Sequence, residues 1–175
     1  MLRQKLSSRL FLEDIHALNK SIAGSPSQKQ KLFNLLFDQD DQIAYQAAWA
    51  MSHFNPIENE WLYSKQDELI DFALLCKHPG KLRLALTILY RQPLETERVD
   101  FLDFCLAQII SRNAALAVQS LCIKIGYELC RPIPELMQEF KAALETIDED
   151  LSPAVAAAKK QVLKAMKKGR SLQTF

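Results

Sequence analysis

The clearest structural signal in the chain is the stretch LFNLLFDQDDQIAYQAAWAM, residues 32–51. Its apolar residues recur at the three- and four-residue steps of an α-helix on both sides of an aspartate-rich turn, residues 38–41. Aspartates in such a turn accept hydrogen bonds from the first backbone N–H groups of the next helix and complement its dipole. The stretch therefore predicts two helices joined by a short polar link.

The same arrangement returns along the chain. The second helices of successive pairs can be superposed at Ile43, Leu82, Leu116 and Val155, which gives steps of 39, 34 and 39 residues. A period of about 40 residues built from two helices is typical of HEAT and armadillo arrays, whereas a tetratricopeptide array needs 34 residues and a different signature. The register predicts an all-α chain of about four helix pairs.

Helix-breaking residues support this register. All seven prolines lie between apolar segments or in their first turn, where a proline does not disrupt a helix. Links within pairs are predicted near residues 39, 78, 112 and 149, and Gly169 is expected to end the last helix. Helix starts are predicted at Ser25, Ser64, Thr96 and Ser152.

Residues 32–51 resemble a HEAT repeat. That family has a leucine-rich first helix, an Asp-containing turn, Val-Arg and an alanine-rich second helix; this chain has Ile43-Ala44 in the first unit and Leu82-Arg83 in the second. The resemblance covers about residues 25–168 and implies a right-handed α-α superhelix with a binding or scaffold role and no catalytic residue. It predicts a single domain, residues 1–175, with an N-terminal capping helix (1–24), helix pairs (25–168) and a tail (169–175). An irregular helical bundle is the alternative.

Composition narrows the function. The 175 residues carry 22 basic and 21 acidic side chains, a net charge of +1, which disfavours a protein whose main task is to neutralise phosphates. The four cysteines lack metal-ligand spacing, and no apolar run reaches the length of a membrane span, so we expect a cytoplasmic protein with reduced thiols. No phosphate loop, catalytic motif or metal motif occurs, so no catalytic residue, cofactor or metal is predicted.

Two charged clusters have simple structural explanations. The aspartates of residues 38–41 and the acidic run at 145–150 could bind Ca²⁺, but capping of the following helix explains them better. The last helix and the residue after its glycine carry six cations and no acid: Lys159, Lys160, Lys164, Lys167, Lys168 and Arg170. A solvated end-cap helix is the favoured interpretation, and a nucleic-acid patch is the alternative.

One polar stripe predicts a binding site. Gln42, Gln46, Trp49 and His53 share a face of the second helix, away from its apolar stripe, and Arg83 lies on the following second helix. Trp and Arg contribute strongly to protein interfaces, so Gln46, Trp49, His53 and Arg83 are predicted to bind a partner; packing of Trp49 in the core is the alternative.

The predicted function is a non-enzymatic scaffold or adaptor that binds a protein or peptide on the concave face. The first alternative is a nucleic-acid-binding module like the HEAT-like DNA alkylation repair glycosylases, and the second is a small enzyme or enzyme-associated subunit. The segment Ala114–Cys130 is predicted to be the most buried helix, with Leu121 in the core at a cost of ~2–5 kcal/mol for Leu121→Ala.

Overall fold

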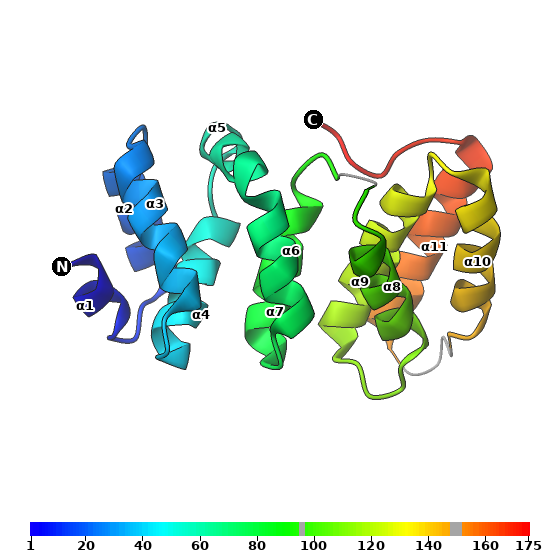
Figure 1. The fold of residues 1–175 in the computed structure, drawn as a ribbon, viewed down its shortest axis with the longest axis horizontal. Helices are drawn as coiled ribbons and strands as arrows, with labels where there is room; N and C mark the ends of the chain where they lie inside the picture. The colour runs from blue at the N-terminus through cyan, green and yellow to red at the C-terminus, as the bar shows by residue number, and fades with distance from the viewer. Residues whose placement is uncertain (95–96, 148–151) are drawn as a thin grey trace. The chain divides into compact units, whose positions relative to one another are not determined.

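A computed structural model describes residues 1–94, 97–147 and 152–175, and every regular element in these ranges is helical (Figure 1). The all-α prediction is confirmed. The chain divides into two compact units, Met1–Ile88 and Leu89–Phe175. The handedness of the superhelix and the single-domain organisation stay predictions.

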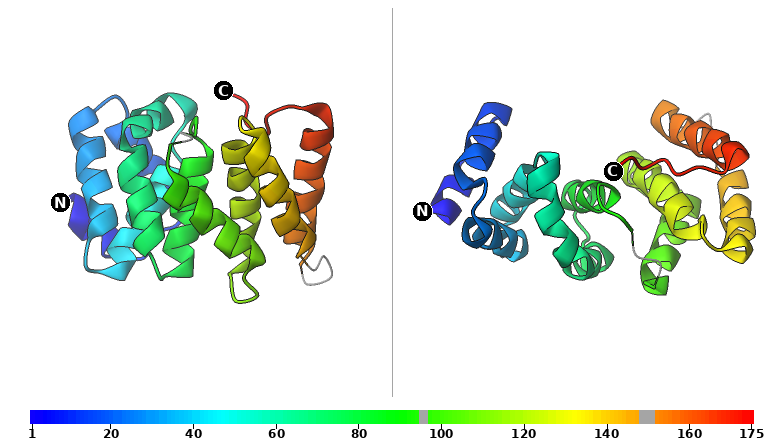
Figure 2. Two further views of the ribbon diagram at one scale, coloured as in Figure 1. Left: turned by 45° about the vertical axis from the view of Figure 1, so that its right-hand side comes forward. Right: turned by 90° about the horizontal axis from the view of Figure 1, so that it is seen from above.

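The first unit consists of short helices that lie side by side (Figure 2). Two turns of 3-10 helix, η1 (Leu35–Phe37) and η2 (Trp61–Lys65), extend α3 and α5. The α-helices are α1 (Leu2–Leu6), α2 (Leu12–Ile22), α3 (Pro26–Asn34), α4 (Asp41–Ser52), α5 (Pro56–Glu60), α6 (Gln66–Leu75) and α7 (Pro79–Tyr90).

Side-chain caps explain several helix starts. The Ser25 side chain accepts a hydrogen bond from the Gln28 N–H at 3.4 Å, as predicted. Asp40 accepts from the N–H of Gln42 at 2.9 Å and caps α4, so the acidic turn serves the helix start. Ser152 likewise accepts from the Val155 N–H.

Of the other two predicted helix starts, one is wrong and one lies outside the described residues. Ser64 does not start a helix: it lies inside η2, and its hydroxyl donates to the Trp61 carbonyl. The preceding Asn55 caps α5 by accepting from the Glu58 N–H, so the chain is already helical before Ser64. Thr96 lies outside the described residues. The predicted single helix over residues 1–24 is two helices, because the chain is not helical between α1 and α2.

The two second helices of the first unit, α4 and α7, meet in the predicted register. The Lys81 ammonium lies 2.6 Å from the Asp41 carboxylate, 40 residues earlier in the chain. The rings of Tyr45 and His78 lie 6.4 Å apart. A Cβ on Gly80 would lie 3.1 Å from the Tyr45 ring, so a glycine permits this close approach. Helix links near residues 39, 78 and 112 are confirmed, and the one near 149 lies outside the described residues.

The second unit is built around one helix. It contains α8 (Val99–Ile110), α9 (Leu116–Cys130), α10 (Pro134–Glu145) and α11 (Pro153–Lys168), and the other three all pack against α9. Residues 125–130, the last six of α9, are all buried, in agreement with the prediction for this segment. Leu121 is half-buried, because the core side of that turn is taken by Cys122 and Ile123. We therefore expect Leu121→Ala to lower the free energy of unfolding by less than the ~2–5 kcal/mol typical of a core leucine.

The chain after α11 folds back onto α9. Gly169 ends α11 in the left-handed conformation with φ 58°, as predicted. The Tyr127 hydroxyl then donates to the Arg170 carbonyl at 2.7 Å, and the Leu172 N–H donates to the buried Glu128 carboxylate at 2.6 Å. The tail therefore supplies partners for polar groups that α9 could not satisfy alone.

Candidate protein-binding surface

The non-buried face of α4 forms a short stripe. The opposite face packs inward through residues that are fully buried, among them Ile43, Ala47 and Ala50. Tyr45 and Trp49 lie half-buried one turn apart, and His53 follows, exposed, at the end of the helix. These three side chains form the accessible aromatic stripe of α4.

Trp49 lies within a cluster of three rings. Its indole meets the His53 imidazole edge-on, with centroids 6.1 Å apart. His53 in turn meets His16 of α2 edge-on at 5.6 Å. Trp49 is half-buried, so part of its ring remains accessible to solvent.

The structure places Gln46 in a different role from the one predicted. Gln46 is only 5% exposed, and its amide donates to the Ser8 carbonyl at 2.6 Å. One turn earlier, the Gln42 amide donates to the Ser7 carbonyl at 2.9 Å. The N-terminal segment thus covers this side of α4, and Gln46 holds that segment in place. Tyr45, four residues before Trp49, lies on the open side of α4 instead, and this spacing of two aromatic residues is the signal in the sequence that marks that side.

Arg83 lies half-buried on α7, with Thr87 one turn later. The Thr87 hydroxyl donates to the Arg83 carbonyl at 2.8 Å. Because Lys81 binds Asp41, α7 lies beside α4 at this end. The hydrogen bond that Lys81 donates to Asp41, together with the positive charge of Lys81, holds the pKa of Asp41 below its usual value. We call Tyr45, Trp49, His53, Arg83 and Thr87 the α4–α7 surface.

The chemistry of this surface suits binding. The rings can bury an apolar side chain of a partner, and the indole N–H and the guanidinium can donate hydrogen bonds. Among the described residues, no group of three or more His, Cys, Asp or Glu side chains is placed to hold a metal ion. No helix in the described parts is both long enough and apolar enough to cross a membrane.

Comparison with known families agrees with the helix pairing. The model of the HEAT repeat domain matches residues 2–166. The chain belongs to the HEAT repeat family. HEAT repeat domains are helical scaffolds that commonly mediate protein interactions and are generally non-enzymatic. Searches of curated proteins and of solved structures found no significant match to this HEAT repeat protein.

Proposed function

We propose that this protein is a non-enzymatic scaffold that binds a segment of a partner protein on its α4–α7 surface. The observation that carries the proposal is the half-buried Trp49, set edge-on to His53 on a second helix. A large rigid ring that keeps part of its surface open can bury a partner side chain at a small entropic cost. Its neighbours supply the polar contacts that fix orientation.

The residues around Trp49 offer different kinds of contact to a partner. Tyr45 and His53 extend the aromatic area along α4, and Arg83 adds a cation on α7. A peptide backbone offers carbonyl oxygens, and these match the donors of this surface. Gln46 contributes indirectly, because its bond to Ser8 keeps the N-terminal segment beside α4.

Charge favours a protein over a nucleic acid at this surface. Lys81 already binds Asp41, which leaves Arg83 as the cation of the set. A nucleic-acid groove needs several cations in line to release counterions. We place the scaffold in the cytoplasm, a proposal supported by its four free cysteines.

The experiment compares Trp49→Ala with Phe37→Ala in the full chain. Phe37 is the matched control: it is a half-exposed aromatic of the same unit, outside the α4–α7 surface, and its ring packs edge-on against Phe33 and Phe72. Immobilised protein captures partners from native lysate, and each captured protein is then tested in purified form. We expect Trp49→Ala to weaken binding by at least about tenfold, while Phe37→Ala changes it less than about threefold.

Stability must be measured on the same variants. Trp49 is only half-buried, so Trp49→Ala should lower the free energy of unfolding by less than the ~3–5 kcal/mol typical of a core aromatic. Equal effects of the two variants on binding would contradict the proposal. So would a loss of stability in the full core range, because Trp49 would then be part of the core.

A further inference from the structure

The second unit carries a groove that is separate from the α4–α7 surface. Helices α10 and α11 both pack more closely against α9 than against each other, which leaves an open groove of about 650 Å³ between them. Its walls come from α10 and α11, and Tyr127 of α9 contributes at one end. All of these residues belong to one compact unit.

The floor of the groove is apolar. Met137 of α10 and Met166 of α11 are half-buried there, and Leu163 is 38% exposed. Methionine side chains adapt to irregular apolar partners, so such a floor can accept aliphatic side chains of more than one shape. An exposed leucine beside two methionines is a small apolar patch that a partner can cover.

The rim of the groove is positively charged. Arg131, Lys141 and Lys167 line it, and none of the described lining residues is acidic. Arg131 also donates to Glu128 at 3.2 Å, so its charge is partly balanced. The positive rim therefore depends mainly on Lys141 and Lys167, one from each wall.

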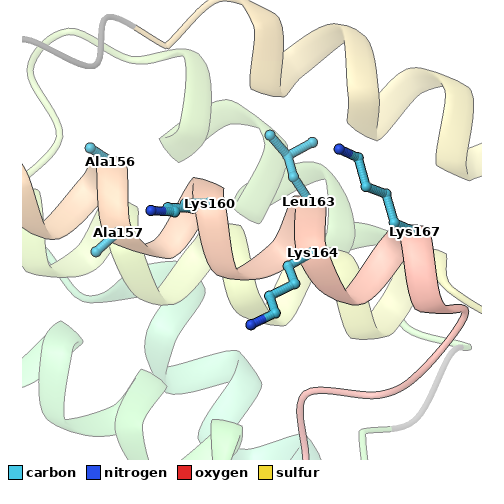
Figure 3. Close-up of a pocket in the computed structure, with 6 residues that line it drawn as sticks. All are labelled: Ala156, Ala157, Lys160, Leu163, Lys164 and Lys167. Carbon is cyan, nitrogen blue, oxygen red and sulfur yellow. The ribbon is translucent and has the colours of Figure 1, made fainter.

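The positive charge continues over the outer side of α11. A second hollow, of about 580 Å³, shares Leu163 and Lys167 with the groove and adds Lys160 and Lys164. Figure 3 shows Leu163 and Lys167 on the side of α11 toward α10, with Lys164 pointing the opposite way. The helix dipole accounts for the lysines in the last turn but not for Lys164 and Lys160, which lie about one and two turns earlier.

We propose that the α10–α11 groove binds an acidic amphipathic helix of a partner protein. The apolar side of that helix would cover Met137, Leu163 and Met166, and its carboxylates would meet Lys141 and Lys167. Helix-in-groove binding uses this combination of apolar anchors and complementary charge. The groove is in the second unit, so the proposal is independent of the α4–α7 surface.

Two other anionic partners fit the structure less well. A membrane-binding amphipathic helix would present its apolar face outward, but the apolar stripe of α11 is buried: Val155, Ala158, Val162 and Ala165. A single-stranded nucleic acid is bound through phosphate contacts and base stacking on accessible aromatic rings, whereas the aromatic ring in this lining, Tyr127, is only 1% exposed. Both become outcomes of the test.

The test uses the full chain and a fluorescent peptide of about 18 residues, or five helical turns, with leucines on one face and glutamates elsewhere. Fluorescence anisotropy measures its binding. Three further probes are a peptide with lysines in place of glutamates, a duplex DNA, and vesicles that contain phosphatidylserine. We expect the acidic peptide alone to bind tightly, with an affinity that falls as salt rises.

Neighbouring lysines of α11 supply the matched control. Lys167 lines the groove and Lys168 does not, yet both are exposed in the last turn, so their reversal changes the net charge and the helix dipole equally. We expect Lys167→Glu to weaken binding at least about fivefold and Lys168→Glu less than about twofold. Leu163→Ser should also weaken it at least about fivefold, and Trp49→Ala should leave it unchanged.

Several results would overturn the proposal. Equal losses for Lys167→Glu and Lys168→Glu would mean diffuse charge attraction without a groove. If Leu163→Ser binds the acidic peptide as tightly as the natural chain does, the apolar floor does not contribute to binding. Tighter binding of the duplex or the vesicles would assign the surface to a nucleic acid or a membrane. If circular dichroism shows that Lys167→Glu does not fold, Lys141→Gln tests the opposite rim, and it too should weaken peptide binding.

Discussion

A buried ion pair in the first unit gives the sharpest stability prediction. Lys29 of α3 is 7% exposed, and its ammonium lies 2.6 Å from the Glu58 carboxylate of α5. Glu58 also accepts from the Gly24 N–H at 3.0 Å. The Lys29 ammonium lies 5.8 Å from the centre of the Trp61 ring. This cluster joins the turn before α3, α3 itself, α5 and η2.

The magnitude follows from burial. Removal of one partner from a buried ion pair costs about 3–5 kcal/mol, because the other charge stays buried without compensation. The Glu58 side chain keeps 12% of its exposure, so we expect Glu58→Gln to lower the free energy of unfolding by about 2–4 kcal/mol at neutral pH. Lys29→Met with Glu58→Gln should cost at least about 1 kcal/mol less than the sum of the single changes.

The loss of stability caused by Glu58→Gln should depend on pH. The hydrogen bond from Lys29 lowers the pKa of Glu58 below 4.5 in the folded chain. A depressed folded pKa stabilises the protein above the unfolded value, and that stability is lost as pH falls through the folded pKa. The difference between the natural chain and Glu58→Gln should therefore be full near neutral pH and shrink in acid below about pH 4.5.

Urea denaturation followed by circular dichroism measures these differences. Glu60→Gln is the matched control, because Glu60 is exposed on the same short helix and its replacement should change stability by less than ~0.5 kcal/mol. The reasoning is refuted if Glu58→Gln costs no more than Glu60→Gln, or if the two single changes at the pair simply add.

Three further changes test other parts of the fold. A Cβ on Gly126 would lie 3.1 Å from the buried Phe140 ring, so Gly126→Ala should destabilise by about 1 kcal/mol in urea despite alanine's better helix propensity; a gain in stability would contradict this. Asp40→Ala removes the cap of α4 and should cost about 1 kcal/mol in the same measurement, and no loss would mean the cap is unimportant. Burial raises the pKa of Cys130 to about 12, so a thiol-reactive disulfide reagent at pH 8 should modify the half-exposed Cys76 quickly and Cys130 only after denaturation; fast modification of Cys130 would contradict the burial.

Local signals explain what the sequence could predict. Serine or aspartate before a helix, and proline in its first turn, act on neighbouring backbone groups, so Ser25, Asp40 and Ser152 revealed their helices directly. The step of about 40 residues was visible because α4 and α7 occupy equivalent places in two pairs. The pair formed by Lys81 and Asp41 shows the same step in space.

Long-range contacts explain what the sequence could not predict. Gln46 was expected on an open face, but residues about 38 positions earlier cover it, and nothing near Gln46 in sequence signals that. Lys29 is buried only because Glu58, 29 residues later, compensates its charge. The tail bond from Leu172 to Glu128 spans 44 residues. In each case the partner residue is far away in the sequence, so the neighbouring residues do not indicate the contact.

Site-specific photo-crosslinking can show which helices of the first unit contact the partner. A photoreactive amino acid placed at position 49 or 83 probes the second helices, and one placed at the exposed Lys31 or Leu75 probes the first helices α3 and α6. With a partner identified by capture, we expect crosslinks from positions 49 and 83 and little or none from 31 and 75. Crosslinks that form equally from all four positions, or chiefly from the first helices, would contradict it.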